Sequence, residues 1–105
     1  MSVIVYNGPG ASEFCVREVL RTLTGLGWWK SIDTISDPQS LVSTLSSFEK
    51  GLLVMPGGRD KPYQESFTGD GVKTIRDFVQ RGGTYIGICA GAYFACENIE
   101  FEVTI

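Results

Sequence analysis

Hydrophobic residues gather in short, unbroken runs along the chain, and the clearest of these runs end at glycine-rich turns. The first run is SVIVY (Ser2 to Tyr6), the second lies within LLVMPGG (Leu52 to Gly58), and the third is TYIGI (Thr84 to Ile88). An apolar run without alternation is typical of a strand buried on both faces of a sheet. The pattern predicts strands at these three places, a weaker strand over Ile32 to Ile35, and a last strand over FEVTI (Phe101 to Ile105).

Segments with helical spacing of hydrophobic residues separate these strands. Ser12 supplies an N-cap for a helix that continues to about Leu26, and Asp37 caps a shorter helix with Pro38 at its first position. A third helix is predicted over Asp70 to Arg81, where a pair of glycines stops it. The apolar positions that define these helices are Val16, Val19, Leu20, Leu23 and Leu26, then Leu41, Val42 and Leu45, then Val72, Ile75, Phe78 and Val79.

The alternation of strands with helices indicates the fold class. Strands that are hydrophobic throughout, each followed by a helix, form a parallel sheet with helices on both faces, because right-handed crossovers place them there. AGAYFAC, after the third strand, has the composition of the first turns of another helix. We therefore predict a doubly wound α/β domain, a three-layer sandwich with a mostly parallel sheet.

Composition limits the size and the partners of this domain. The 105 residues, of which 43% are hydrophobic and 20% charged, suffice for a single domain over 1–105 with one core. The net charge of −3, with Lys and Arg scattered singly, provides no positive stripe, so we expect no nucleic-acid partner. No segment resembles a signal peptide or reaches membrane-spanning length, so we expect a cytoplasmic protein without membrane contact.

The cysteines do not form a recognisable framework. Cys15, Cys89 and Cys96 are an odd number, at spacings that fit neither a disulfide scaffold nor a zinc site. We expect free thiols, no metal and no cofactor. Cys15 and Cys96 fall on predicted helices without flanking glycines, which favours a structural role for both.

Three glycine-rich turns are the strongest signal for a site. In open parallel sheets, ligands bind beyond the carboxyl ends of the strands, near the switch in strand order. Those ends carry NGPG with Gly8 and Gly10, PGG with Gly57 and Gly58, and GICAG. The first turn lacks the glycine spacing of a dinucleotide-binding loop or a P-loop, so it predicts an anion-binding loop only weakly.

Cys89 stands between Gly87 and Gly91 where a strand becomes a helix, the arrangement of a nucleophile elbow. A cysteine there gains thiolate character from the helix N-terminus. The other interpretation is a small residue chosen for close packing, inert as most buried cysteines are. A thiol needs a proton donor to expel an amine from an amide, and the chain contains no histidine to provide it.

Other residues would complete a site around this thiol. The main-chain N–H groups of Gly57, Gly58 and Ala90 are candidate donors to an oxyanion or another anion, although glycines in a turn also serve conformation alone. Tyr63 and Tyr93 are expected near the site. Glu13 follows the first turn and is either within reach of Cys89 or a solvated residue in the first turn of a helix.

The sequence resembles the N-terminal domain of eukaryotic-type biotin-protein ligases and their stand-alone relatives, which is similar to class I glutamine amidotransferases. The segments that carry this resemblance are VYNGPG (5–10), VMPGGRDKPY (54–63), FVQRGGTYIGICAGAYFA (78–95) and EFEV (100–103). The resemblance covers essentially all 105 residues. It implies a flavodoxin-like sandwich, with Cys89 at the position of the amidotransferase nucleophile and Gly57 and Gly58 in the oxyanion-hole loop.

Departures from the amidotransferase pattern shape the expected function. The histidine and glutamate that follow the nucleophile far downstream are missing, and Ala92-Tyr93 replace the glutamine common after GxCxG. The glycine- and arginine-rich adenylate loop and the lysine of the biotinylating domain are also missing, so the chain alone makes no biotinyl-adenylate. We expect a truncated domain, either a fragment of a longer protein or a minimal member of the family.

Two functions from different classes remain. The first is a non-catalytic module that binds a small molecule or a protein partner at the strand ends. The second is a thiol enzyme, a hydrolase or transferase in which Cys89 attacks an activated carbonyl such as a thioester or aldehyde. The missing histidine favours the first. An exposed edge of a short sheet would be covered by pairing in a homodimer.

Overall fold

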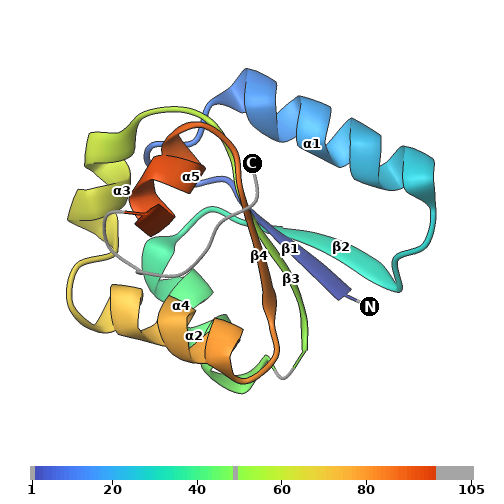
Figure 1. Cartoon of the computed structure of the whole chain (residues 1–105). Coiled ribbons are helices and arrows are strands. Elements are labelled where there is room, and N and C mark those ends of the chain that lie inside the picture. Colours follow the sequence, from blue (N-terminus) through green and yellow to red (C-terminus); the bar gives the residue numbers. More distant parts are fainter. Residues whose placement is uncertain (1, 49, 97–105) are drawn as a thin grey trace.

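A four-stranded parallel sheet forms the centre of the computed structural model, which describes residues 2–48 and 50–96 (Figure 1). The strands are β1 (Ser2–Tyr6), β2 (Ser31–Ile35), β3 (Gly51–Met55) and β4 (Thr84–Gly87). Their order is β2-β1-β3-β4, and each neighbouring pair is parallel. The strand order therefore reverses between β1 and β3, which confirms the predicted doubly wound parallel sheet.

Helices lie on both faces of this sheet, so the sandwich has three layers (Figure 1). Helix α1 (Glu13–Leu26) covers one face. The opposite face carries α2 (Pro38–Ser47), α3 (Asp60–Ser66), α4 (Asp70–Gln80) and α5 (Ala90–Phe94). No helix in the described part of the chain is long and apolar enough to span a membrane.

The helix caps follow the sequence. The Ser12 side chain accepts a hydrogen bond from the backbone N–H of Cys15, and the Asp37 carboxylate accepts one from Ser40 N–H at 3.1 Å. Pro38 occupies the first helical turn of α2, where its missing N–H costs nothing. Gly27 ends α1 in the left-handed conformation with φ 71°. The predicted starts of both helices are therefore confirmed.

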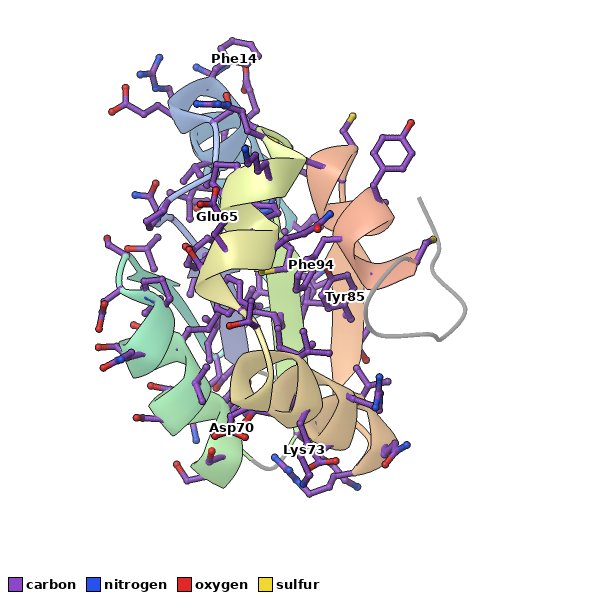
Figure 2. All side chains as sticks on the ribbon, turned by 90° about the vertical axis from the view of Figure 1, so that its left-hand side faces the viewer. Phe14, Glu65, Asp70, Lys73, Tyr85 and Phe94 are labelled. Atoms are coloured by element: carbon purple, nitrogen blue, oxygen red, sulfur yellow. The ribbon has the colours of Figure 1, made fainter. Side chains whose placement is uncertain are left out.

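The core has two parts because successive strand residues face opposite sides of the sheet. Val3 and Val5 of β1 contact the residues of α1, whereas Ile4 and Tyr6 face the four helices on the other side. The larger part includes several aromatic rings, such as the edge-to-face pair Tyr6 and Phe67 with centroids 5.1 Å apart. Figure 2 shows Tyr85 and Phe94 lying within the molecule, while Phe14 projects away from it.

The prediction that each strand is hydrophobic and covered along its whole length is wrong for two strands. β2 is an edge strand whose residues are half-buried or exposed. On β4, Thr84 and Ile86 are exposed on the face that carries α1, because α1 packs mainly on β1 and β2. This leaves an apolar hollow of about 530 Å³ between α1, Trp28, Trp29 and the outward residues of β3 and β4.

Two further differences concern single elements. Helix α3 has no counterpart in the sequence prediction, because it is only seven residues long, contains Pro62 and has no side-chain cap at Arg59. The buried rings of Tyr63, within α3, and of Phe67, directly after it, attach this helix to the core. The strand expected over Phe101 to Ile105 lies outside the described residues.

Candidate functional site

Three turns meet at the carboxyl edge of the sheet, beside the switch in strand order. They follow β1 (Asn7 to Gly10), β3 (Pro56 to Gly58) and β4 (Ile88 to Ala90). The three strands are adjacent and parallel, so their turns share one edge. This is the place where doubly wound folds bind their ligands.

The first two turns are joined through their backbones. Ser12 N–H donates to Gly57 C=O at 2.9 Å, and Arg59 N–H donates to Gly10 C=O at 2.8 Å. A Cβ added to Gly58 would lie 1.9 Å from the Gly10 carbonyl oxygen, so only glycine allows the two segments to approach this closely. The PGG turn is therefore fixed relative to the start of α1.

The turn between β4 and α5 depends on two glycines. A Cβ on Gly91 would lie 2.1 Å from the Met55 carbonyl oxygen, and a Cβ on Gly87 would lie 2.7 Å from the Ala92 nitrogen. Met55 C=O also accepts a hydrogen bond from Ile88 N–H at 3.1 Å. The first turn of α5 thus lies directly against the end of β3, which forces the chain to bend sharply at residue 89.

Cys89 has a strained backbone conformation at this bend. Its φ is 49° and its ψ is −106°, and no other non-glycine residue in the described ranges has a positive φ. Such a conformation costs on the order of 1–3 kcal/mol. Cys89 is exposed, so packing of its side chain in the core does not offset this cost. Strained residues cluster at functional sites, so this conformation makes Cys89 the candidate functional position of the edge.

Cys15 also reaches this edge, which the sequence reasoning missed. The Gly57 N–H donates to Cys15 Sγ at 3.1 Å. A Cβ on Gly57 would lie 3.4 Å from Cys15 Sγ and 3.7 Å from Cys89 Cβ, so Gly57 separates the two cysteine side chains. One signal could have indicated this contact: Cys15 lies in the first turn of the helix after NGPG, and that helix begins at the carboxyl edge of the sheet.

The predicted anion donors differ in their availability. Gly57 is buried and its N–H is occupied by the Cys15 sulfur. Gly58 is exposed, and within residues 2–48 and 50–96 its N–H has no hydrogen-bond partner. Ala90 is the first residue of α5, and the N–H groups in the first turn of a helix have no acceptor within that helix. Of the three predicted donors, the structure therefore leaves the N–H groups of Gly58 and Ala90 unpaired in the described ranges.

The other predicted site residues divide into supporting and exposed positions. Tyr63 is fully buried and packs on Gly10, which has φ 98°. A Cβ on Gly8 would lie 2.3 Å from the Ser36 carbonyl oxygen, so Gly8 serves the shape of the first turn. Tyr93 is 62% exposed on α5, and Glu13 is exposed in the first turn of α1.

Tyrosine hydroxyls bond to the first two turns and to the start of α5. Tyr6 Oη donates to Pro9 C=O at 3.0 Å, Tyr63 Oη to Pro56 C=O at 2.6 Å, and Tyr85 Oη to Gly91 C=O at 2.6 Å. Burial raises the pKa of Tyr6 to about 12. Burial also raises the pKa values of Tyr63 and Tyr85. The neutral phenols act as fixed donors that hold the edge in shape.

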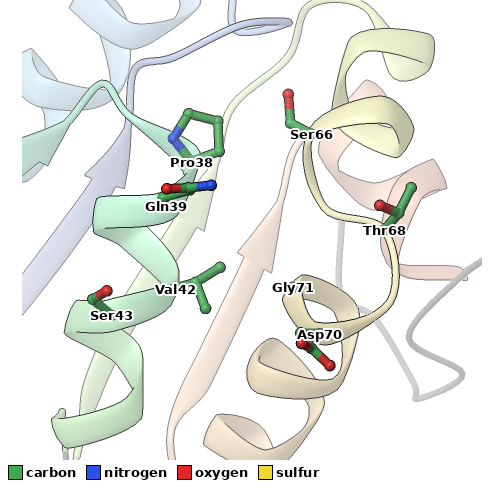
Figure 3. A pocket seen from close by; sticks show the side chains of 8 residues that line it. All are labelled: Pro38, Gln39, Val42, Ser43, Ser66, Thr68, Asp70 and Gly71. Atoms are coloured by element: carbon green, nitrogen blue, oxygen red, sulfur yellow. The ribbon is translucent and has the colours of Figure 1, made fainter.

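A second hollow, lined by both polar and apolar side chains, lies on the face of the sheet that carries α2. It has a volume of about 430 Å³ and lies between α2, the end of α3 and the start of α4 (Figure 3). Hydroxyl groups, an amide and the Asp70 carboxylate surround it. None of the predicted site residues lines this hollow. It is therefore separate from the Cys89 edge.

Comparison with known proteins gives the family. The chain matches the family described as "Biotin-protein ligase, N terminal" over residues 1–105. The chain belongs to the biotin-protein ligase N-terminal family. It is 38% identical over 103 residues to the biotin-protein ligase of Schizosaccharomyces pombe, and 34% identical over 101 residues to an uncharacterised protein of Chlamydia muridarum. No solved structure matches it.

Both of these relatives are much longer than the present chain. The match includes 98% of the chain but 16% of the S. pombe protein, and 94% of the chain but 39% of the C. muridarum protein. The chain thus spans less than half of the length of either relative. The family match confirms the resemblance that the glycine-rich motifs indicate.

The close approach of Gly91 to Met55 predicts the effect of one added methyl group. Gly91→Ala should destabilise the domain by about 1–3 kcal/mol or more, because backbone atoms have to move. Gly25→Ala is the matched control, since a Cβ there meets nothing within 4 Å and alanine favours a helix by roughly 0.5–1 kcal/mol. Urea unfolding followed by circular dichroism measures both, and equal stabilities would contradict the packing described for α5.

The buried Tyr6 phenol predicts a loss of stability in alkali. The unfolded chain releases this proton near pH 10 and the folded chain only near pH 12. The stabilising contribution is therefore complete below pH 10 and decreases as the pH rises toward 12. Urea unfolding across this range should show a smaller decrease for Tyr6→Phe than for the wild type. Identical pH profiles would show that the Tyr6 hydroxyl is not buried as described.

Proposed function

We propose that this domain binds a small molecule bearing a carboxylate or carbonyl group at the Cys89 edge, without turning it over. The observation that carries the proposal is the strained, exposed Cys89 beside unpaired main-chain donors. The N–H groups of Gly58 and Ala90 suit an oxygen acceptor, and the exposed Arg59 follows Gly58 directly. The same donors suit a carboxylate or carbonyl presented by a protein partner.

Two features favour binding over amide hydrolysis. The chain has no histidine to protonate a leaving amine, a role usually worth roughly a hundred- to ten-thousand-fold in rate. The Gly57 N–H, one of the expected oxyanion donors, is occupied by Cys15. In class I glutamine amidotransferases, which the sequence resembles, a histidine and an oxyanion hole accompany the nucleophile. In this chain the same edge keeps the thiol and part of the donor set.

The positive φ of Cys89 supports a second candidate, a thiol enzyme in which the Gly-Ile-Cys-Ala-Gly turn is a nucleophile elbow. The Cys89 sulfur would attack an activated carbonyl, form an acyl thioester and release a leaving group that needs no acid. Water would then hydrolyse the thioester. This reaction uses the exposed sulfur and does not require histidine.

Protection from alkylation tests the binding proposal. Iodoacetamide labelling of Cys89 should slow in the presence of acetate, glutamate or biotin, used as carboxylate probes, because the bound carboxylate covers the sulfur. Cys96 is an exposed thiol in the same chain and serves as the internal control, with an unchanged rate. Peptide mass spectrometry measures both sites. If no probe slows labelling at Cys89, the edge does not bind carboxylates and the proposal is wrong.

Turnover separates the two candidates. With p-nitrophenyl acetate, a binding domain should show no continued release of nitrophenol above that of buffer alone once its exposed thiols are acetylated, in the wild type and in Cys89→Ser alike. The Cys96→Ser variant should behave like the wild type. Continued release of nitrophenol that depends on Cys89 would establish the thiol enzyme and contradict binding without turnover.

A further inference from the structure

Two cysteines that are far apart in the sequence both lie near one residue of the PGG turn. The Cβ position of Gly57 lies 3.4 Å from Cys15 Sγ and 3.7 Å from Cys89 Cβ. The separation between that sulfur and that Cβ is therefore at most the sum of the two distances. Cys15 belongs to the first turn of α1 and Cys89 to the β4–α5 bend, so their meeting comes from the tertiary structure alone.

The two thiols differ in a way that suits successive steps of one oxidation. Cys89 is exposed and open to a reagent in solution, whereas Cys15 is half-buried behind the turn. The Cys15 sulfur accepts the Gly57 N–H at 3.1 Å, and the side chain packs against the core under α1. Redox-active cysteines are typically an accessible thiol with a second thiol nearby that completes the disulfide.

We propose that Cys89 and Cys15 form a reversible disulfide when the domain meets a hydroperoxide. The Cys89 thiolate attacks one peroxide oxygen, which breaks the O–O bond and gives Cys89 sulfenic acid and hydroxide. The Cys15 thiol then releases its proton to the solvent, and its thiolate attacks the Cys89 sulfur. The S–S bond forms, the S–O bond breaks, and the sulfenic oxygen leaves as hydroxide, which the released proton converts to water. Each disulfide consumes one peroxide, and a thiol reductant restores both cysteines.

The bond requires the sulfurs to approach to about 2.05 Å, with the two Cβ atoms roughly 3.5–4.5 Å apart. The proposed bond therefore requires both side chains to rotate toward the space beside Gly57 and the Cys89 bend to shift. The disulfide would occupy the Cys89 sulfur and close the edge at its centre. The proposal does not depend on what the edge binds, because it uses only the two thiols and the peroxide.

Hydrogen peroxide tests the proposal directly on the wild-type chain. We expect a product lighter by two hydrogen atoms, and a Cys15–Cys89 peptide in a digest made without reductant. The Cys96→Ser variant should give the same product, since Cys96 takes no part. In Cys15→Ser the reaction should stop at Cys89 sulfenic acid, which dimedone captures at that residue.

Two results would overturn the proposal. One is a disulfide that links different cysteines, either between two chains or through Cys96. The other is equal capture of Cys89 sulfenic acid by dimedone in the wild type and in Cys15→Ser, which would show that Cys15 does not react with it. Circular dichroism of Cys15→Ser before oxidation checks that the variant is folded, and Cys15→Ala provides an apolar replacement if it is not.

Discussion

The contact between Gly91 and the end of β3 determines the shape of the candidate site. The Met55 carbonyl lies so near the Gly91 Cα that a single methyl group would overlap it. Because α5 starts this close to β3, the chain has only two residues in which to turn from strand to helix. Cys89 absorbs the turn in a strained conformation, and its thiol is left exposed at the edge of the sheet.

The rest of the edge is built to hold that arrangement. Backbone hydrogen bonds join the PGG turn to the first turn, and the hydroxyls of three buried tyrosines donate to carbonyls in these two turns and at the start of α5. Each phenol replaces the water that a buried carbonyl would otherwise need. The edge therefore presents an exposed thiol, and the chain contains no histidine that could act as the acid in amide chemistry. For this reason we propose binding ahead of catalysis.

Much of the fold could be predicted from the sequence because local signals agree with the tertiary structure. The unbroken apolar runs became β1, β3 and β4, and the caps at Ser12 and Asp37 began α1 and α2. Helix α3 could not be predicted, since a seven-residue segment with a proline has too little periodicity and owes its order to burial of Tyr63. Exposure of Ile86 could not be predicted either, because it depends on which strands α1 covers.

The candidate site was predictable only in part. Glycine spacing indicated the three turns and Cys89, because close backbone approach requires glycine at fixed positions. The position of Cys15 at the site could not be predicted, because its contact with Gly57 arises from the placement of α1, whose own sequence carries no chemical motif. Likewise, the occupied N–H of Gly57 is a property of that contact and not of the PGG motif.

The strain at Cys89 is the central claim, and the free energies of unfolding of Cys89→Gly and Cys89→Ala measure it most directly. Glycine normally destabilises a folded chain relative to alanine, because it gives the unfolded state more freedom. At a position with φ 49° the order should reverse, with Cys89→Gly more stable than Cys89→Ala by about 1 kcal/mol. An alanine variant that is as stable as the glycine variant, or more stable, would contradict the account.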